Sequence, residues 1–197
     1  MKTADVLKEF EEAGALMRGH FILSSGLHSD VYLNKSIVSM QPDRTERLCR
    51  ALADKARGAV RGAIEVVISP AMGAIIYGYE TARWLKVPFM FVERVDGAFE
   101  LRRGFSVPKG AKVLVVEDIV STGLSARECV DAVRKAGGDV VAIACLIDRS
   151  GGKADFDVPL IPLAELKVDA WPGDKLPAHL ANVPAVKPGS RGVSQSA

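Results

Sequence analysis

The segment of residues 112–129 carries the strongest chemical signal in the chain and reads KVLVVEDIVSTGLSAREC. An apolar run, Val113–Val116, precedes two adjacent acids, Glu117 and Asp118, and then a turn rich in hydroxyl groups and glycine, residues 121–125. Backbone N–H groups at the start of a helix, together with Ser and Thr hydroxyls, can hold a phosphate group without bulky side chains. The segment therefore predicts an anion site beside two carboxylates.

The acids and the turn have different chemistry, which separates their expected roles. Glu117 and Asp118 would repel a phosphate, so we expect them to accept hydrogen bonds from a vicinal diol of the same ligand. Gly123 lets the backbone approach the phosphate closely, and Ser125 is expected to cap the helix that follows. For a short acidic and glycine-containing turn an ordinary strand end is the commoner explanation, and the whole string is needed to outweigh it.

Other phosphate-binding motifs are missing from the sequence. Neither Gly-x-x-x-x-Gly-Lys-Ser/Thr nor Gly-x-Gly-x-x-Gly after a strand occurs, which weakens nucleotide-triphosphate and dinucleotide interpretations. A second turn between an apolar run and a helical stretch lies at Ser69–Gly73. Taken alone, this turn would be weak evidence, because such turns are common in α/β proteins.

The elements that would position these turns alternate between buried strands and helices. Apolar runs occupy residues 65–69, 88–92, 113–116 and 140–147, and helical patterns occupy 73–85 and 125–136. Strands buried on both faces need no polar alternation, so this order predicts an α/β fold with a parallel sheet covered by helices on both faces. Ligands of such sheets bind beyond the carboxyl ends of the strands.

The N-terminal part has a different pattern. Thr3 is expected to cap a helix that Gly14 ends, and Phe21–Ser39 follows a period near two with a bend at Ser25-Gly26. Pro42 is suited to the first turn of the next helix. We therefore divide the chain into an N-terminal helix and β-rich cover (1–40), an α/β core (41–172) and a C-terminal extension (173–197), with 183–197 expected to be loosely ordered.

Composition narrows the class of function. The chain has 197 residues, 48% of them hydrophobic, and a net charge of +2, which allows one well-packed domain and gives little support to a nucleic-acid partner. The sequence has no apolar run of about 18 residues, and its first residues are charged and amphipathic. We expect a cytoplasmic protein with no membrane partner that acts on small molecules.

Cysteine and histidine give no sign of metal or redox chemistry. The cysteines are widely spaced within apolar segments, so we expect reduced core residues rather than zinc ligands or disulfides. The histidines form no recognisable general-base or metal set, and no protein metal ligand is expected. The residues concerned are Cys49, Cys129, Cys145, His20, His28 and His179.

Residues 112–129 resemble the signature with which type I phosphoribosyltransferases bind 5-phosphoribosyl-1-pyrophosphate (PRPP): hydrophobic residues, two acids and a Thr/Ser-Gly turn. The resemblance implies that family's fold, a central mainly parallel sheet flanked by helices with a small N-terminal hood. It also implies a loop that holds pyrophosphate at Ala71, Met72 and Gly73. The implied PRPP-binding residues are Glu117, Asp118, Ile119, Val120, Ser121, Thr122, Gly123, Leu124 and Ser125.

The segment Phe21–Gly26, followed by Ser29 and Tyr32, is similar to the Phe-x-Leu-x-Ser-Gly segment of the orotate phosphoribosyltransferases. Two further stretches, 145–151 (CLIDRSG) and 187–191 (KPGSR), are typical of the bacterial and archaeal branch. Orotate is planar and carries a carboxylate, which suits a guanidinium group. The resemblance implies that orotate contacts Ser121, Arg149, Ser25 and Gly26, although composition alone would favour a surface role for Arg149.

The implied reaction is a glycosyltransferase step of UMP biosynthesis, in which PRPP and orotate give orotidine 5′-monophosphate and pyrophosphate. Its transition state should resemble a ribosyl oxocarbenium ion, so catalysis would rest on positioning and on neutralising the leaving pyrophosphate. Mg²⁺ held mainly by substrate oxygens fits this role. The resemblance also implies a homodimer with shared active sites.

One loop departs from the family pattern. Family members carry a basic loop introduced by Arg-Lys with further Lys and His, whereas Glu93 stands here in place of the first Arg and the later Lys and His are missing. Arg94, Arg102 and Arg103 are candidates, with Asp118, for the catalytic set. For Arg102 and Arg103, a solvated hairpin edge is an equally good interpretation.

The lysine that usually precedes Ser-Gly in the family is also replaced, by Ser24. Lys35 is a candidate substitute, although a lone lysine is more often only solvated.

Two other functions remain open. A phosphoribosyltransferase for a purine base would share the acidic motif, but Phe21–Gly26 and Arg149 argue against it. A non-catalytic regulator of the same fold that binds nucleotide or RNA is conceivable because of the altered loop, and the near-neutral charge argues against RNA.

Overall fold

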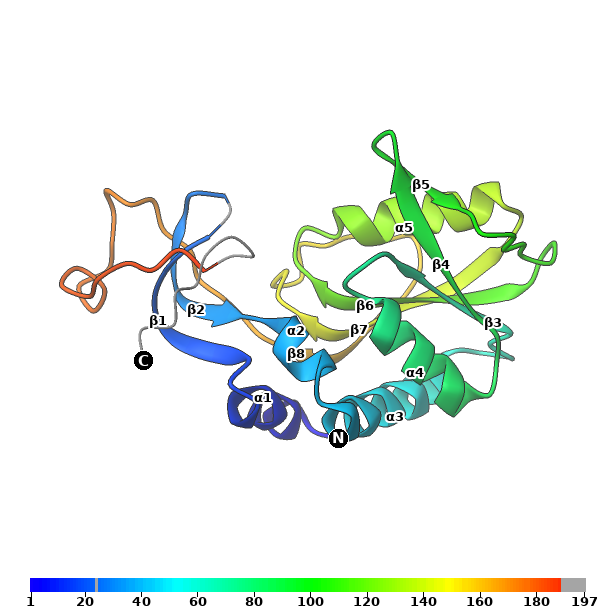
Figure 1. The fold of residues 1–197 in the computed structure, drawn as a ribbon, viewed down its shortest axis with the longest axis horizontal. Helices are drawn as coiled ribbons and strands as arrows, with labels where there is room; N and C mark the ends of the chain where they lie inside the picture. The colour runs from blue at the N-terminus through cyan, green and yellow to red at the C-terminus, as the bar shows by residue number, and fades with distance from the viewer. Residues whose placement is uncertain (24, 189–197) are drawn as a thin grey trace.

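The computed structural model describes residues 1–23 and 25–188 and contains a six-stranded sheet within them (Figure 1). The strand order is β5-β4-β3-β6-β7-β8, and every neighbouring pair is parallel except the antiparallel β4–β5 hairpin at one edge. The expected mainly parallel α/β sheet is therefore confirmed. The strands are β3 (Val66–Pro70), β4 (Phe89–Val95), β5 (Ala98–Leu101), β6 (Lys112–Val120), β7 (Asp139–Asp148) and β8 (Leu160–Glu165).

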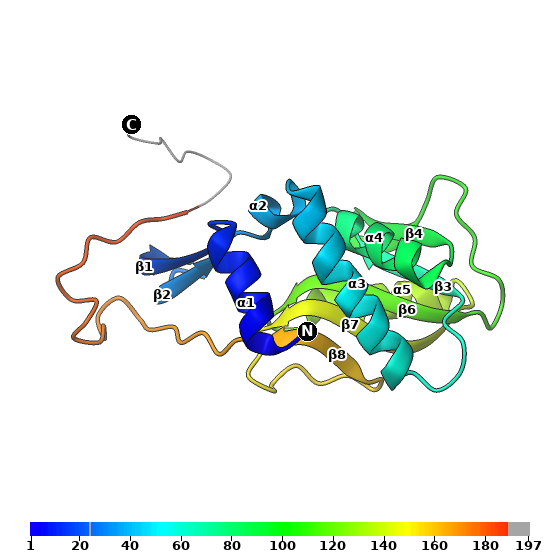
Figure 2. The same ribbon diagram turned by 90° about the horizontal axis from the view of Figure 1, so that it is seen from below.

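Helices cover both faces of this sheet (Figures 1 and 2). Along β6, Leu114 and Val116 pack into the core beneath the first helical layer, and Val113 and Val115 pack into the core beneath α5. Burial on both faces explains the continuous apolar run, because each fully buried aliphatic side chain contributes about 1.5–3 kcal/mol. The first layer holds α1 (Thr3–Glu12), α3 (Pro42–Ala59) and α4 (Ile75–Leu85), and the other face holds α5 (Leu124–Lys135).

The hood is an antiparallel pair, β1 (Leu16–Ile22) and β2 (His28–Leu33), separate from the main sheet. The expected period of two through Ser39 is wrong at its end, since Lys35–Ser39 forms a short helix, α2. Lys35 already interrupts the apolar alternation, and the helical turn brings Val38 into the core with no exposed surface.

Residues 171–188 lie along the hood, which the sequence did not indicate (Figure 1). Backbone bridges join Phe21 to Val186 and His28 to Trp171. His20 is buried, and its Nε2 lies 2.6 Å from Nδ1 of His28, while its Nδ1 lies 2.7 Å from the carbonyl oxygen of Val183. The hood is thus built from both ends of the chain. Residues 189–197 of the expected loose tail lie outside the described residues.

The three cysteines are buried and unpaired, as expected. Burial raises the pKa of the Cys49 thiol to about 12 and raises those of Cys129 and Cys145 as well, which disfavours the reactive thiolates. Among the residues described, no helix combines the length and apolar character needed to cross a membrane.

Candidate active site

The two adjacent acids lie inside β6, at the level where the neighbouring strand β3 ends. The β3–β6 pairing runs to Ile68 opposite Val115, so Pro70, the last residue of β3, is level with Glu117. On the other side, β7 continues to Asp148, opposite Val120. This stagger opens the sheet edge beside the acids and places the loop after β3 next to them, because parallel strands end at the same edge.

Glu117 and Asp118 face opposite sides of the sheet, since successive side chains of a strand alternate. Glu117 follows the parity of Val113 and Val115 and lies on the α5 side. It is 6% exposed, and burial, followed by the charge of Asp118, raises its pKa to about 7 against an opposing hydrogen bond with Ser125. At neutral pH this carboxyl group therefore changes its charge readily.

Asp118 points to the side of α2 and α4, where it meets a cation and a loop. Its carboxylate forms an ion pair with the Lys35 ammonium, and its Oδ1 accepts a hydrogen bond from the Ile119 N–H at 2.5 Å. A Cβ atom at Gly73 would collide with both the Asp118 carboxylate and the Lys35 ammonium. The loop of Ala71, Met72 and Gly73 therefore reaches the acid because residue 73 has no side chain.

The hydroxyl-rich turn leads into α5, with one correction to its expected cap. Helix α5 begins at Leu124, and its N-cap is Gly123 at φ +76°, so the prediction that Ser125 caps the helix is wrong. Glycine adopts this left-handed conformation readily, and a Cβ there would lie 2.8 Å from the Phe156 ring. Ser125 instead lies in the first turn of α5, close enough to Glu117 to oppose the rise in the pKa of that carboxyl group. Ser121 and Thr122 are exposed, so their hydroxyls are accessible to a ligand.

The pairing of β6 with β7 brings Arg149 to the end of β6, where it is hydrogen-bonded to Val120, the residue before Ser121. The Arg149 N–H donates to the Val120 carbonyl oxygen at 2.8 Å, and Asp148 Oδ1 accepts from the Ser150 N–H at 2.8 Å. The Arg149 side chain is half-buried, and burial lowers the pKa of its guanidinium. Among the described residues it has no acidic partner, which leaves a cation available at this edge.

The arginines of the β4–β5 hairpin are engaged elsewhere. Arg94 donates to Glu128 on α5 and lies over the Phe99 ring, 4.3 Å from its centroid. Arg103 pairs with Glu93 through two hydrogen bonds of 2.7 and 2.8 Å, and this pairing lowers the pKa of Glu93. Arg102 is exposed and has no ion-pair partner in the described part of the chain. The hairpin projects beyond the core of the sheet (Figure 1).

Ser25 and Gly26 form the turn of the hood hairpin. Gly26 has φ +81°, and its N–H donates to the Leu23 carbonyl oxygen at 2.9 Å. No hydrogen bond or ion pair within residues 1–23 and 25–188 joins this turn to the edge of the main sheet. Ser24 and residues 189–191 of the KPGSR stretch lie outside the described residues.

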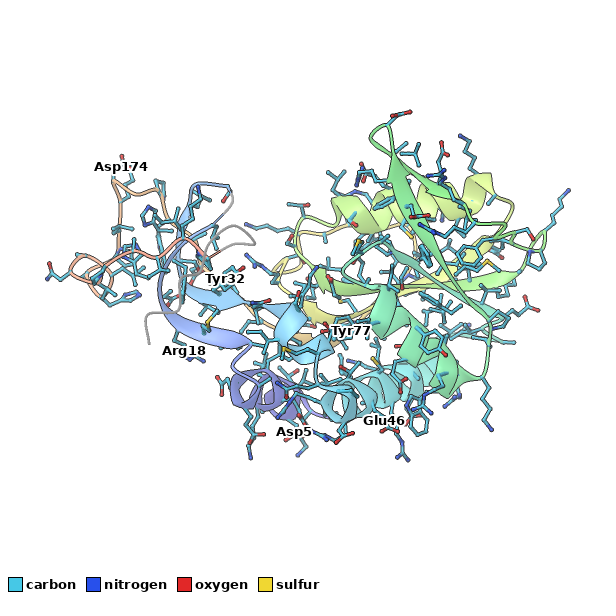
Figure 3. The ribbon with its side chains drawn as sticks, in the orientation of Figure 1. Asp5, Arg18, Tyr32, Glu46, Tyr77 and Asp174 are labelled. Atoms are coloured by element: carbon cyan, nitrogen blue, oxygen red, sulfur yellow. The ribbon has the colours of Figure 1, made fainter. Side chains whose placement is uncertain are left out.

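Tyr77 is a supporting residue that the sequence did not indicate. It is labelled in Figure 3, is fully buried, and donates from its hydroxyl to the Lys35 carbonyl oxygen at 2.7 Å. Its position on the apolar face of α4 predicts only a core residue. A buried tyrosine whose hydroxyl needs a partner is the one available signal.

Grooves elsewhere on the molecule do not include the acids. One of about 670 Å³ lies against α1 and α3, and another of about 510 Å³ lies between α5 and residues 155–157. Neither is lined by Glu117, Asp118 or Arg149. We assign the candidate site by its chemistry. The sheet edge combines two acids, the Arg149 guanidinium and the hydroxyl-rich turn of residues 121–125, and neither groove has this combination.

Sequence relatives agree on one activity. The phosphoribosyl transferase domain family matches residues 41–161. The orotate phosphoribosyltransferase of Parvibaculum lavamentivorans is 61% identical over 194 residues, covering 98% of this chain and all of the relative. That of Caulobacter vibrioides (strain NA1000 / CB15N) is 60% identical over 191 residues, covering 97% of this chain and 98% of the relative.

Solved structures share the fold. Orotate phosphoribosyltransferase from Aeropyrum pernix has a TM-score of 0.68 and 26% identity, covering 82% of this chain and 93% of that one. Adenine phosphoribosyltransferase from Saccharomyces cerevisiae has a TM-score of 0.64 and 19% identity, covering 81% and 99%. The fold is therefore common to enzymes with different bases, and the choice of base depends on closer sequence similarity.

Proposed function

This chain belongs to the orotate phosphoribosyltransferase family, and from this premise we propose how its sheet edge transfers ribose 5-phosphate from PRPP to orotate. The products are orotidine 5′-monophosphate and pyrophosphate, in the route to UMP. The observation that carries the site assignment is the meeting of Asp118, Lys35 and the Gly73 loop beside the turn of residues 121–125.

Each part of the edge has a role that follows from its charge. The 5-phosphate is held by the backbone and hydroxyls of residues 121–125, and the ribose diol by Glu117 and Asp118, which accept hydrogen bonds. The pyrophosphate lies against residues 71–73. Because these groups belong to one ligand, PRPP spans the end of β6.

Orotate is assigned to the adjacent end of β7. Its carboxylate pairs with Arg149, which is half-buried and has no acidic partner among the described residues. Ser121 supplies a hydroxyl from the neighbouring turn, and the Ser25-Gly26 turn of the hood supplies the remaining contact.

Bond changes at the ribose need no protein nucleophile. The bond between C1 and the pyrophosphate oxygen breaks, and its electron pair leaves with pyrophosphate. A ring nitrogen of orotate, which has first lost its proton to solvent, supplies the electron pair of the new bond to C1. The protein accelerates it by alignment and by placing cations where negative charge increases.

Mg²⁺ is part of the proposal, and the residues at the sheet edge could provide a few of its ligands but not a complete set. The described residues contain no group of three or more His, Cys, Asp or Glu that could hold a metal ion. Glu117 and Asp118 offer hard oxygens, which suits an ion held mainly by ligand oxygens and waters. When bound, Mg²⁺ would supply positive charge to the pyrophosphate.

We also propose a homodimer with shared active sites. Large apolar side chains are exposed on the loop after β3 and on α4, among them Met72 (83% exposed), Ile76 and Tyr79. Such a patch beside the site favours coverage by a second copy. Sedimentation equilibrium tests this, and a monomer at the concentrations used for the activity assay would contradict it. The cytoplasmic location stays a prediction that cell fractionation would check.

A product assay tests the function. Purified protein with Mg²⁺ and PRPP is expected to consume orotate and form orotidine 5′-monophosphate and pyrophosphate in equal amounts, while adenine and xanthine give no nucleotide. Turnover of a purine instead would support the purine alternative. A folded protein that binds nucleotide without turnover of any base would support the non-catalytic regulator.

A further inference from the structure

Lys35 lies between Asp118, which we assign to the ribose of PRPP, and the loop of residues 71–73, which we assign to its pyrophosphate. Its ammonium pairs with Asp118 on one side, and on the other it lies where a Cβ of Gly73 would be. The Lys35 side chain is 38% exposed, whereas that of Asp118 is 4% exposed. The ammonium therefore lies at the mouth of the site, between the acid and the loop after β3.

The backbone that carries Lys35 is held firmly. The Tyr77 hydroxyl donates to the Lys35 carbonyl oxygen at 2.7 Å, and the Asn34 N–H donates to the Ala15 carbonyl oxygen at 2.7 Å. The Thr45 hydroxyl donates to the Val38 carbonyl oxygen at 3.0 Å at the other end of α2. The flexible side chain of Lys35 thus starts from a fixed backbone, so its ammonium group can change position by side-chain rotation without a change in the fold.

The Lys35 ammonium neutralises the buried Asp118 carboxylate, and this alone could explain a lysine at this position. The ion pair does not, however, use all the hydrogen-bond donors of the ammonium. An ammonium has three donors, and the Asp118 carboxylate engages one of them. Asp118 Oδ1 already accepts a hydrogen bond from the Ile119 N–H. Because part of the head is exposed beside the Gly73 loop, donors remain for a ligand on that side.

We propose that Lys35 is a catalytic residue that donates to the leaving pyrophosphate of PRPP from between Asp118 and the loop of residues 71–73. This inference rests on the proposed function. As the bond from C1 breaks, its electron pair moves onto the pyrophosphate oxygen, and the Lys35 ammonium stabilises that increasing charge. Asp118 meanwhile turns from ammonium to ribose hydroxyl as its partner.

The test measures the binding of the two products, pyrophosphate and orotidine 5′-monophosphate, separately. Lys35→Met removes the charge and keeps the aliphatic stem, Lys35→Arg keeps the charge, and Lys135→Ala on the exposed last turn of α5 is the matched control. Calorimetry measures the binding of inorganic pyrophosphate with Mg²⁺ and, separately, of orotidine 5′-monophosphate. Steady-state turnover of orotate is followed in parallel.

Lys35→Met is expected to weaken pyrophosphate binding and lower kcat by about tenfold or more, with orotidine 5′-monophosphate binding changed less than about twofold. Lys35→Arg should recover much of both losses, and Lys135→Ala should match the wild type. Equal weakening of both products would overturn the proposal, because it would mean that Lys35 only maintains Asp118.

A second comparison guards against loss of folding when the buried acid is left unpaired. In an Asp118→Asn background the acid no longer needs a counter-charge, so adding Lys35→Met should still weaken pyrophosphate binding about tenfold. No additional effect there would also overturn the proposal. Failure of the wild type to turn over orotate would instead refute the proposed function, which keeps the two failures distinct.

Discussion

The carboxyl end of β6 and the β4–β5 hairpin both bring charge to the neighbourhood of the site, but they hold it differently. Glu117 and Asp118 are buried at positions fixed by two parallel neighbours. Arg103 and Arg94 are exposed or half-exposed and bind acids of their own surface, Glu93 and Glu128.

Burial decides what each region can do. In the sheet edge it raises the pKa of Glu117 to about 7, so the group responds strongly to any new partner. On the hairpin, solvent screens the ion pairs, and their partners can be exchanged at small cost. Under the proposed function, we expect the sheet edge to fix the geometry of the ligand and the hairpin to contribute charge that can be rearranged.

Asp118→Asn should give the largest effect, because it removes the proposed acceptor of the ribose diol together with the ion-pair partner of Lys35. We expect kcat/KM for PRPP to fall towards a hundredfold in steady-state assays, in line with a charged hydrogen bond of about 1.5–3 kcal/mol. Asp131→Asn, on the exposed face of α5, is the control. Unchanged PRPP kinetics would remove Asp118 from the site.

Arg149→Ala should act on one substrate. The KM for orotate is expected to rise about thirtyfold through loss of a charged hydrogen bond, while the KM for PRPP changes less than about twofold. Arg61→Ala, an exposed arginine elsewhere, provides the matched control. An equal rise in both KM values would show that Arg149 does not select the base.

Glu117 should give the sheet edge a pH dependence. The ionised carboxyl group accepts from the diol, so kcat/KM for PRPP should rise about tenfold between pH 6 and 8 with an inflection near 7. Glu117→Gln should lose that inflection, and its persistence would assign it to another group.

The same shift affects stability in the opposite direction. The folded pKa of Glu117 lies above its ordinary value of 4.5, so between about pH 4.5 and 7 the folded state binds more protons than the unfolded state. The contribution of Glu117 to stability is therefore present at low pH and decreases as the pH rises through this window. Thermal melts of wild type and Glu117→Gln would show the difference.

The hairpin should give the smallest effects. Arg102→Ala is expected to lower kcat a few-fold because Arg102 is free among the described residues, and Arg103→Ala should change it less than about twofold because Glu93 already engages Arg103. Orotate KM should stay constant in both. A larger loss for Arg103 would mean that its pair with Glu93 opens during turnover.

Much of the sheet could be predicted from the sequence, and the reason is local. The apolar runs that became β3, β6 and β7 are buried on both faces, so their composition alone indicates parallel strands, whereas β4 is mostly half-buried. Strand β8 was not predicted, and neither was the pairing of Val186 with the hood, because such contacts depend on partners far apart in the chain.

Within the candidate site, the motif did not indicate the directions in which its side chains point. The expected strand stopped at Val116, whereas β6 continues to Val120. Acids are unfavourable in buried strands, so the sequence did not indicate that β6 continues through Glu117 and Asp118. It therefore did not indicate that these two side chains lie on opposite faces of the sheet. The Ser125 cap was wrong for a similar reason, since only the backbone shows that Gly123 starts the helix.

The most direct test of the account is a crystal structure of the protein with orotidine 5′-monophosphate bound. We predict the 5-phosphate on residues 121–125, the ribose hydroxyls on Glu117 and Asp118, and the orotate carboxylate on Arg149. A nucleotide bound in the α1–α3 groove, or one whose phosphate lies away from that turn, would contradict the assignment of the active site to the end of β6.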